Sequence, residues 1–423
     1  MLCECVMPCT GRVVLRFLKT GFSSSESAKG CSSRLGCFRN ATSNRPLQPH
    51  AKHHMASIPN LRTLRTGRRG HALRGGRSSR GAQYGDDDGD VRSVEEGRDA
   101  IIQQTDHDAS STRVSTVSLG YLDDPFAKAF LAPGEQITKR YPIIHRGTYV
   151  RTEAIDKLVI RFLDTRPEQR KQIVSLGAGS DTRFFRLMTR RSGSPQSTVA
   201  YHELDFEANA NQKRNILRQS TELSDCLKQA EQNGSTYHLH AIDLRDLTNK
   251  SPPTIPGLDQ TLPTLLLSEC CLCYLPPDAA ASVLQYFTMN LPGSLVLILY
   301  EPIRPFDAFG KTMVTNLASR GIHLQTLKRY SSLQTQRQRL LLAGLSDGQG
   351  ARDVYQLYGD EEWVSQSERE RIEKLEWLDE VEEWKLLASH YCVAWGWRGE
   401  VFTEAWQGLQ GSRTAGEDED EPG

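Results

Sequence analysis

The sequence has no excess of charge of either sign, since 52 Lys and Arg balance 52 Asp and Glu among its 423 residues. It therefore lacks a general attraction to polyanions, and we expect no nucleic-acid partner. No apolar run approaches the ~20 residues that a membrane span needs, so no membrane partner is expected. The ten cysteines show neither zinc-ribbon spacing nor a disulfide framework, which predicts no metal and a reducing, cytoplasmic environment.

The charge is unevenly distributed along the chain. Residues 1–85 contain fifteen Lys and Arg but only two acids, and they are rich in Ser and Gly. This composition predicts a disordered basic extension over residues 1–104. An Arg-rich, acid-poor N-terminus is also typical of a targeting peptide, and a true start at Met55 is another explanation. The acidic run Glu417–Glu421 predicts a disordered tail over 411–423, which leaves 105–410 as the folded domain.

Strand-like apolar runs alternate with helical patterns in the central part of the chain. Five runs predict strands: Gln172–Leu176, 201–205, 238–243, 265–269 and 293–300. A helix capped by Thr152 is predicted before them, and further helices are predicted at 183–190, 206–217 and 277–291. This alternation predicts an α/β fold, with a parallel sheet and helices on both faces. The C-terminal part adds predicted helices at 333–342 and 367–388 and a closing strand at 391–397.

A glycine-containing turn follows the first predicted strand and opens a helix. Gly177-Ala178-Gly179 alone is a weak signal, because short turns of this kind occur in many folds. The dinucleotide pattern requires a third glycine at position 182, where this chain has Thr182. That glycine serves a bound pyrophosphate, which S-adenosylmethionine lacks. The pattern therefore favours S-adenosylmethionine over a nicotinamide cofactor, with a purely structural turn as the alternative.

Three of the predicted strands end in an acidic residue: Asp205, Asp243 and Glu269. The carboxyl ends of parallel strands form the ligand crevice of an open α/β sheet, and carboxylates there suit a ligand with hydroxyls, amino groups and a positive charge. Asp205 and Asp243 could instead cap the helices that follow them. Glu269 follows an apolar run, so a buried carboxylate at this position needs a partner or a ligand.

The residues resemble the leucine carboxyl methyltransferase family, in its fungal form, from about Asp106 to Gly399. The matching segments are 119–125, 146–151, 175–182, 203–206, 243–247, 268–274, 375–380 and 390–392. Because these segments occur in the family's order, the resemblance is specific. It implies a class I S-adenosylmethionine-dependent methyltransferase fold, with a mostly parallel seven-stranded sheet and added helical elements.

The resemblance also implies where the cofactor binds. Arg151 would pair with the methionine carboxylate, Gly177 would lie against the same moiety, and Glu269 would face the methionine end. Arg113 would be a further contact of the cofactor; the family often has lysine at this position, and arginine keeps the charge but not the geometry.

Further implied contacts concern the nucleoside and the acceptor. Asp205 would hold the ribose hydroxyls, while Asp243 and Leu244 would frame the adenine. Tyr274 is a candidate for the substrate pocket, with packing at a strand end as the alternative.

The family's members esterify the C-terminal leucine of the protein phosphatase 2A catalytic subunit, and this implies the same reaction for a monomeric enzyme here. An α-carboxylate has a pKa near ~3.5, so it is ionised at neutral pH and we expect no catalytic base. The alternatives are a small-molecule carboxyl or O-methyltransferase and a non-catalytic phosphatase-binding module. Trp363, Trp377 and Trp384 are interleaved with charge, which favours either a protein-binding surface or packing within the domain.

Overall fold

The computed structural model describes residues 88–132, 134–190 and 198–409. Most of the predicted N-terminal extension and the predicted acidic tail lie outside these residues. Within the described residues, no helix is long and apolar enough to cross a membrane.

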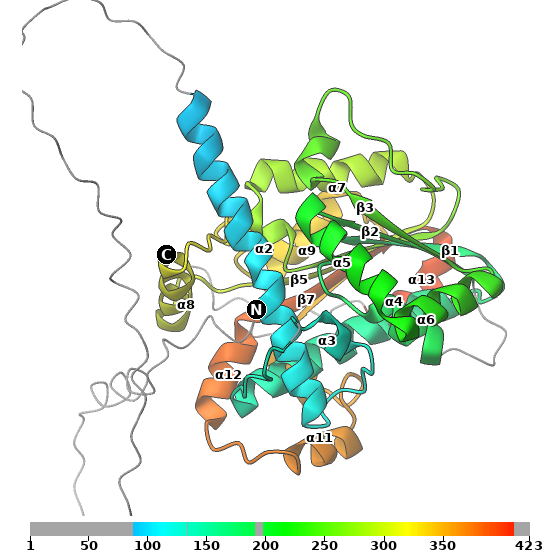
Figure 1. The fold of residues 1–423 in the computed structure, drawn as a ribbon. Helices are drawn as coiled ribbons and strands as arrows, with labels where there is room; N and C mark the ends of the chain where they lie inside the picture. Colours follow the sequence, from blue (N-terminus) through cyan, green and yellow to red (C-terminus); the bar gives the residue numbers. More distant parts are fainter. Residues whose placement is uncertain (1–87, 133, 191–197, 410–423) are drawn as a thin grey trace, which may run out of the picture. The chain divides into compact units, whose positions relative to one another are not determined.

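A single seven-stranded sheet organises the described chain (Figure 1). Its strands run in the spatial order β3-β2-β1-β4-β5-β7-β6, and the first five are mutually parallel while β7 is antiparallel to both of its neighbours. The strands are β1 (Lys171–Leu176), β2 (Val199–Asp205), β3 (Thr236–Ala241), β4 (Thr264–Glu269), β5 (Leu295–Pro302), β6 (Gly348–Asp353) and β7 (Tyr391–Arg398). This order is that of class I S-adenosylmethionine-dependent methyltransferases, so the expected fold is confirmed.

Helices cover both faces of the sheet, which explains why its central strands are apolar throughout. Successive residues of β4 alternate between two hydrophobic clusters: Leu265 and Leu267 face the cluster that contains α3 and α4, and Leu266 faces the cluster that contains α7 and α9. The longer helices are α2 (Asp88–Ser118), α3 (Pro142–Asp164), α4 (Arg183–Arg190), α5 (Glu207–Gln219), α6 (Thr221–Gln232), α7 (Pro277–Asn290), α8 (Ala308–Ser319), α9 (Leu333–Leu342), α11 (Gln366–Glu373) and α12 (Val381–Ser389). Two short ones are α10 (Val354–Gly359) and α13 (Glu400–Trp406).

Two predicted starts are wrong. Helix α3 begins at Pro142, where a proline fits the first turn, so Thr152 is a buried mid-helix residue and caps nothing. The folded part begins before Thr105, because α2 starts at Asp88 and Asp99 already forms an ion pair with Arg245.

Strand β6 was not predicted, because its sequence Gly-Gln-Gly-Ala-Arg-Asp contains no β-branched or aromatic residue. Its glycines are explained by the neighbouring strand. A Cβ on Gly348 would lie 2.2 Å from the Trp397 ring, and one on Gly350 would lie 2.4 Å from the Trp395 ring. The indoles of β7 therefore occupy the space that side chains of β6 would need.

Stacked histidines on the neighbouring strands β2 and β3 make stability depend on pH. His202 stacks on His238 and His240, with ring centroids 4.7 and 5.3 Å away. Burial, helped by these two neighbours, lowers the pKa of His202 to about 3. The unfolded chain takes up a proton near the ordinary value of ~6.5 and the folded chain does not. The stability that neutral His202 contributes is therefore fully present above pH ~6.5, and it is lost as the pH falls from ~6.5 towards 3.

We expect His202→Phe to reduce the pH dependence of the free energy of unfolding, because phenylalanine keeps the stacking area but cannot be protonated. The measurement is the free energy of unfolding in urea between pH 7 and 5, a range above most carboxylate titrations. Replacing the exposed His323 in the same way should leave the wild-type slope. A slope that His202→Phe does not alter would contradict this account.

Candidate cofactor pocket

One pocket at the carboxyl ends of β1, β2 and β4 contains all eight residues that the sequence analysis selected. They are Arg113, Arg151, Gly177, Asp205, Asp243, Leu244, Glu269 and Tyr274. Residues far apart in the sequence thus meet at the edge of the sheet where open α/β folds bind ligands. None of the described residues that line this pocket is a histidine.

The two glycines of the turn after β1 are required by close neighbours. Gly177 has φ of 62° and Gly179 has φ of 48°, which glycine adopts without strain. A Cβ on Gly177 would lie 2.5 Å from the Cys271 sulfur, and one on Gly179 would lie 2.2 Å from Oδ1 of Asp106. The backbone of this turn can therefore be approached closely on the pocket side only because both side chains are absent.

Asp205 at the end of β2 is tied to that turn. Its Oδ2 accepts the N–H of Gly179 at 2.6 Å, and its Oδ1 accepts the N–H of Phe206 at 2.7 Å and the amide of Asn209 at 3.0 Å. Burial raises the pKa of this carboxyl, and the N–H of Gly179 opposes the shift. Asp205 thus supports the glycine turn as well as lining the pocket.

Asp243 and Leu244 lie at the third strand end. The side chain of Asp243 accepts the backbone N–H of Arg245 at 2.9 Å and caps the short helical turn that follows, as the alternative interpretation predicted. Its carboxylate also pairs with the Arg245 guanidinium, which reaches Asp99 of helix α2 at 2.5 Å. Leu244 is buried beside them.

Glu269 at the end of β4 lies between two arginines. Arg151 of α3 donates from Nε to one carboxylate oxygen, and Arg183 of α4 donates to the other at 3.1 Å. Burial alone would raise the pKa of Glu269, but Arg151 and Arg183 outweigh it and lower the pKa to about 2. The Arg151 guanidinium also lies 4.6 Å from the centre of the Tyr300 ring, so its plane is fixed from a second direction.

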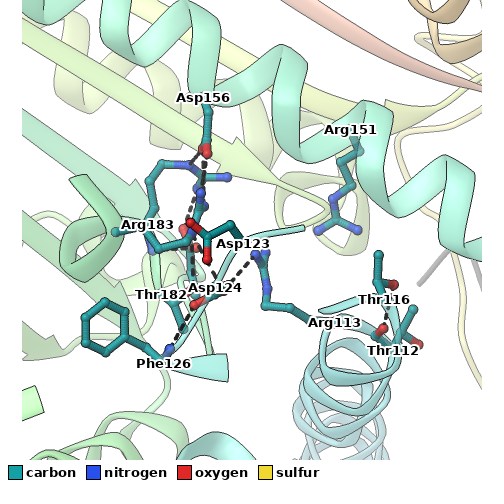
Figure 2. A network of polar contacts seen from close by, with 12 residues as sticks. Thr112, Arg113, Thr116, Asp123, Asp124, Phe126, Arg151, Asp156, Thr182 and Arg183 are labelled. Carbon is teal, nitrogen blue, oxygen red and sulfur yellow. Dashed lines mark hydrogen bonds and ion pairs between the residues drawn. The ribbon is translucent and has the colours of Figure 1, made fainter. Parts of the chain in front are cut away.

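A buried layer of ion pairs lies next to Arg151 (Figure 2). Asp156 of α3 accepts from both Arg183, at 2.8 Å, and Arg186. Asp124 accepts from the Thr182 hydroxyl at 2.5 Å. Figure 2 shows Arg113 reaching from α2 towards Asp124, with Nη1 3.5 Å from Oδ2. Arg113 and Arg151 are therefore anchored to the same scaffold from opposite helices.

Apart from Arg113, sequence analysis missed the pocket-facing side of α2. Residues at helical spacing on this helix line the pocket: Arg98, Asp99, Ile102, Thr105, Asp106, Ala109, Thr112 and Arg113. Asp106 accepts both the backbone N–H and the hydroxyl of Ser180, each at 2.7 Å. The i, i+3, i+4, i+7 spacing was a readable signal, but the face is polar, and Arg98, Asp99 and Ile102 precede the expected start of the domain.

We expect Gly179→Ala to weaken cofactor binding by about tenfold. The new methyl group would displace Asp106, and the turn would shift to relieve the ~1–2 kcal/mol that a left-handed backbone costs a non-glycine residue. If this cost has to be met again when the ligand restores the turn, the affinity falls by about tenfold. Calorimetric titration with S-adenosylmethionine measures the effect. The double variant Gly179→Ala/Asp106→Ala should recover part of the affinity, because the clash is removed while the backbone strain remains.

The matched control for that prediction is Gly293→Ala, because no atom lies within 4 Å of a Cβ at this glycine. The affinity of Gly293→Ala for S-adenosylmethionine should equal that of the wild type. Unchanged affinity in Gly179→Ala would show that the turn does not touch the ligand.

Comparison of the sequence with known proteins identifies its family. The sequence model of the family described as "Leucine carboxyl methyltransferase" matches residues 101–288. Leucine carboxyl methyltransferase 1 of Aspergillus fumigatus is 50% identical over 396 residues, which cover 84% of this chain and 98% of that protein. The chain belongs to the leucine carboxyl methyltransferase family.

Other members of the leucine carboxyl methyltransferase family are similar over most of their length. The Emericella nidulans protein of the same name is 49% identical, covering 84% of this chain and 97% of that protein. The Yarrowia lipolytica protein is 41% identical, covering 70% of this chain and 97% of that protein. Among solved structures, a putative methyltransferase from Thermobifida fusca is 13% identical with a TM-score of 0.39, over 60% of this chain and 82% of that one. The curated relatives decide the family: the protein is an S-adenosylmethionine-dependent methyltransferase.

Proposed function

We propose that this enzyme transfers the methyl group of S-adenosylmethionine to the α-carboxylate of the C-terminal leucine of the protein phosphatase 2A catalytic subunit, forming a methyl ester. The observation that carries the proposal is the convergence of two guanidiniums, Arg113 and Arg151, with three strand-end carboxylates in one pocket. This distribution of charge matches a cofactor that is anionic at its carboxylate and cationic at its ammonium and sulfonium groups. The name of the relatives, leucine carboxyl methyltransferase 1, supports leucine carboxyl groups as the acceptor.

The cofactor fits the residues present, and each end of the pocket has a distinct role. Arg151 would hold the methionine carboxylate, while Gly177 would let the ligand lie against the backbone and Glu269 would face the methionine end. Asp205 would accept from the ribose hydroxyls, and Asp243 with Leu244 would frame the adenine. The bound cofactor supplies an electrophilic methyl group on a positively charged sulfur.

The acceptor needs positioning rather than activation. Its carboxylate is already ionised at neutral pH, so no proton would have to be moved, and the residues of the pocket would have to align a carboxylate oxygen with the methyl group that the cofactor would supply. Such a transfer would combine an anion and a cation into neutral products, so charge would be lost. Residues of helix α2 line one side of the pocket, and exclusion of water by a bound acceptor would favour this loss of charge over solvation of the separated ions.

Tyr274 is the proposed contact on the acceptor side, and Arg113 is a further proposed contact of the cofactor. Arg113 brings a positive charge to the pocket wall from α2, where it can steer a carboxylate. Tyr274 is 5% exposed and follows the strand that ends in Glu269, and it lines the pocket together with Gln325. The side-chain amide of Gln325 donates to the backbone carbonyl of Tyr274, so the position of Tyr274 is held from a separate segment.

Incubation with the phosphatase 2A core enzyme and methyl-labelled S-adenosylmethionine tests the function. We expect label on the catalytic subunit that mild base releases as methanol, because esters are base-labile and N-methyl groups are not. A phosphatase that lacks its last leucine is the control and should stay unlabelled. Label that resists base, or that persists on the truncated phosphatase, would contradict the proposal.

A further inference from the structure

A large aromatic side chain stands out on the surface between α11 and α12. Trp377 is 84% exposed, although tryptophan is highly buried on average in folded proteins. The other two tryptophans considered with it, Trp363 and Trp384, are 4% and 2% exposed, so for these two the alternative of packing within the domain is confirmed. Only Trp377 needs an explanation outside the packing of the domain.

Two further exposed apolar side chains follow Trp377 in the sequence, on helix α12. Val381 is 54% exposed and Leu386 is 44% exposed, and the exposed positions Glu382 and Lys385 lie beside them at helical spacing. The Lys385 ammonium lies 5.8 Å from the centre of the Tyr355 ring. We call Trp377, Val381, Glu382, Lys385 and Leu386 the α12 surface.

The segment that carries Trp377 is held in place from within. Glu376 points inward and forms a 2.6 Å hydrogen bond with Nδ1 of His145, whose Nε2 lies 2.9 Å from the Ser115 hydroxyl. The flanking Leu375 and Leu378 pack against the hydrophobic core. Trp377 is therefore presented on a fixed backbone, which reduces the ordering cost of binding a partner.

The charge around this surface is strongly negative. Residues 373–383 contain six acids and one lysine. Burial, together with Asp379 and Glu383, raises the pKa of Glu380, so like charges repel one another here. None of Asp379, Glu380, Glu382 and Glu383 forms an ion pair with the other residues that the structure describes. A partner with Lys and Arg at its rim would relieve this repulsion.

Helix α3 connects the α12 surface to the cofactor pocket. Arg146 of α3 lies 5.2 Å from the Tyr358 ring and 5.9 Å from the Trp384 ring, in the layer under α12. Two residues further along α3, Thr148 lines the pocket, and Arg151 follows one turn later. The α12 surface therefore lies over the same helix that positions the proposed cofactor contact.

We propose that the α12 surface, centred on Trp377, docks the folded body of the protein acceptor, through a patch that is apolar at its centre and basic at its rim. This rests on the proposed function and adds a recognition element remote from the reacting carboxylate. A second copy of this chain fits the surface less well, because a two-fold contact through Trp377 would bring the two acidic segments face to face. Tryptophan is among the residues that most often dominate binding energy at interfaces.

The test compares Trp377→Ala with wild type on two acceptors, the folded phosphatase and a peptide of its last six residues. We expect kcat/KM for the folded phosphatase to fall by about tenfold or more, chiefly through KM, while kcat/KM for the peptide and the affinity for S-adenosylmethionine stay unchanged. Asp379→Lys should lower kcat/KM for the folded acceptor only, with a loss that shrinks in high salt.

Leu342→Ala is the matched control, since Leu342 is 76% exposed and lies at the end of α9. Both acceptors should respond to this variant as to wild type. Equal kinetics of Trp377→Ala and wild type on the folded acceptor would overturn the docking surface, as would an equal loss on protein and peptide. Loss of self-association without a kinetic change would instead assign the surface to a second copy. Wild-type protein that methylates neither acceptor would overturn the proposed function itself, and the acceptor-docking role with it.

Discussion

Replacing Arg151 with alanine is expected to reduce the affinity for S-adenosylmethionine by about ten- to a hundredfold, as a hydrogen bond to a charged group contributes ~1.5–3 kcal/mol. Methyl transfer should fall further, because Arg151 also fixes Glu269, and a misplaced group costs rate as well as affinity. Calorimetric titration and initial rates at saturating cofactor separate the two effects.

The matched control is Arg161→Ala on the same helix. The Arg161 side chain is 39% exposed and lies 3.8 Å from Glu362, far from the pocket lining. Its removal should leave both affinity and rate at wild-type values. Arg151→Lys is informative as well, because lysine keeps the charge but loses the planar fork; an intermediate affinity would show that geometry matters. Wild-type affinity in Arg151→Ala would exclude this residue from the cofactor site.

Replacing Asp156 with asparagine is expected to cost about 3–5 kcal/mol of unfolding free energy, because it leaves two buried guanidiniums without their shared carboxylate. The side chains of Asp156, Arg183 and Arg186 are 4%, 0% and 3% exposed. Arg186 and Arg183 hold the pKa of Asp156 well below its usual value against the effect of burial. Urea unfolding at neutral pH measures the loss.

A surface ion pair supplies the comparison for that variant. Lys228 and Asp225 pair at 2.9 Å with side chains that are 66% and 54% exposed, and Asp225→Asn should change the stability by less than about 1 kcal/mol. If Asp156→Asn were as mild as Asp225→Asn, the buried network would not be a structural support of the pocket. Cofactor affinity measured on the folded fraction shows whether the loss also reaches Glu269 through Arg183.

The sheet was predictable because its strands carry strong local signals. Runs such as Leu265–Leu267 are apolar on both faces, as a parallel sheet covered by helices requires, and each of three runs ends in a carboxylate. The glycine turn and these acids locate the ligand-binding edge without any tertiary information. Helices α4 and α9 were predicted with their observed ends, Arg183–Arg190 and Leu333–Leu342.

The missed features depend on partners that are distant in the sequence. Strand β6 is readable only once Trp395 and Trp397 are known to lie against its glycines. Asp106 becomes a pocket residue only when α2 folds over the turn after β1, 74 residues away. The inward position of Glu376 and the outward position of Trp377 follow from His145, which lies 231 residues earlier than Glu376. No local propensity encodes such contacts.

Tandem mass spectrometry of the phosphatase C-terminal peptide, after incubation with the wild-type chain and S-adenosylmethionine, tests the central claim most directly. The account predicts a mass gain of one methylene that fragmentation places on the α-carboxylate of the last leucine. Base treatment should reverse this gain, and Arg151→Ala should produce almost none of it. A methyl group on any other atom of the peptide, or an unmodified leucine after a complete reaction time course, would contradict the account.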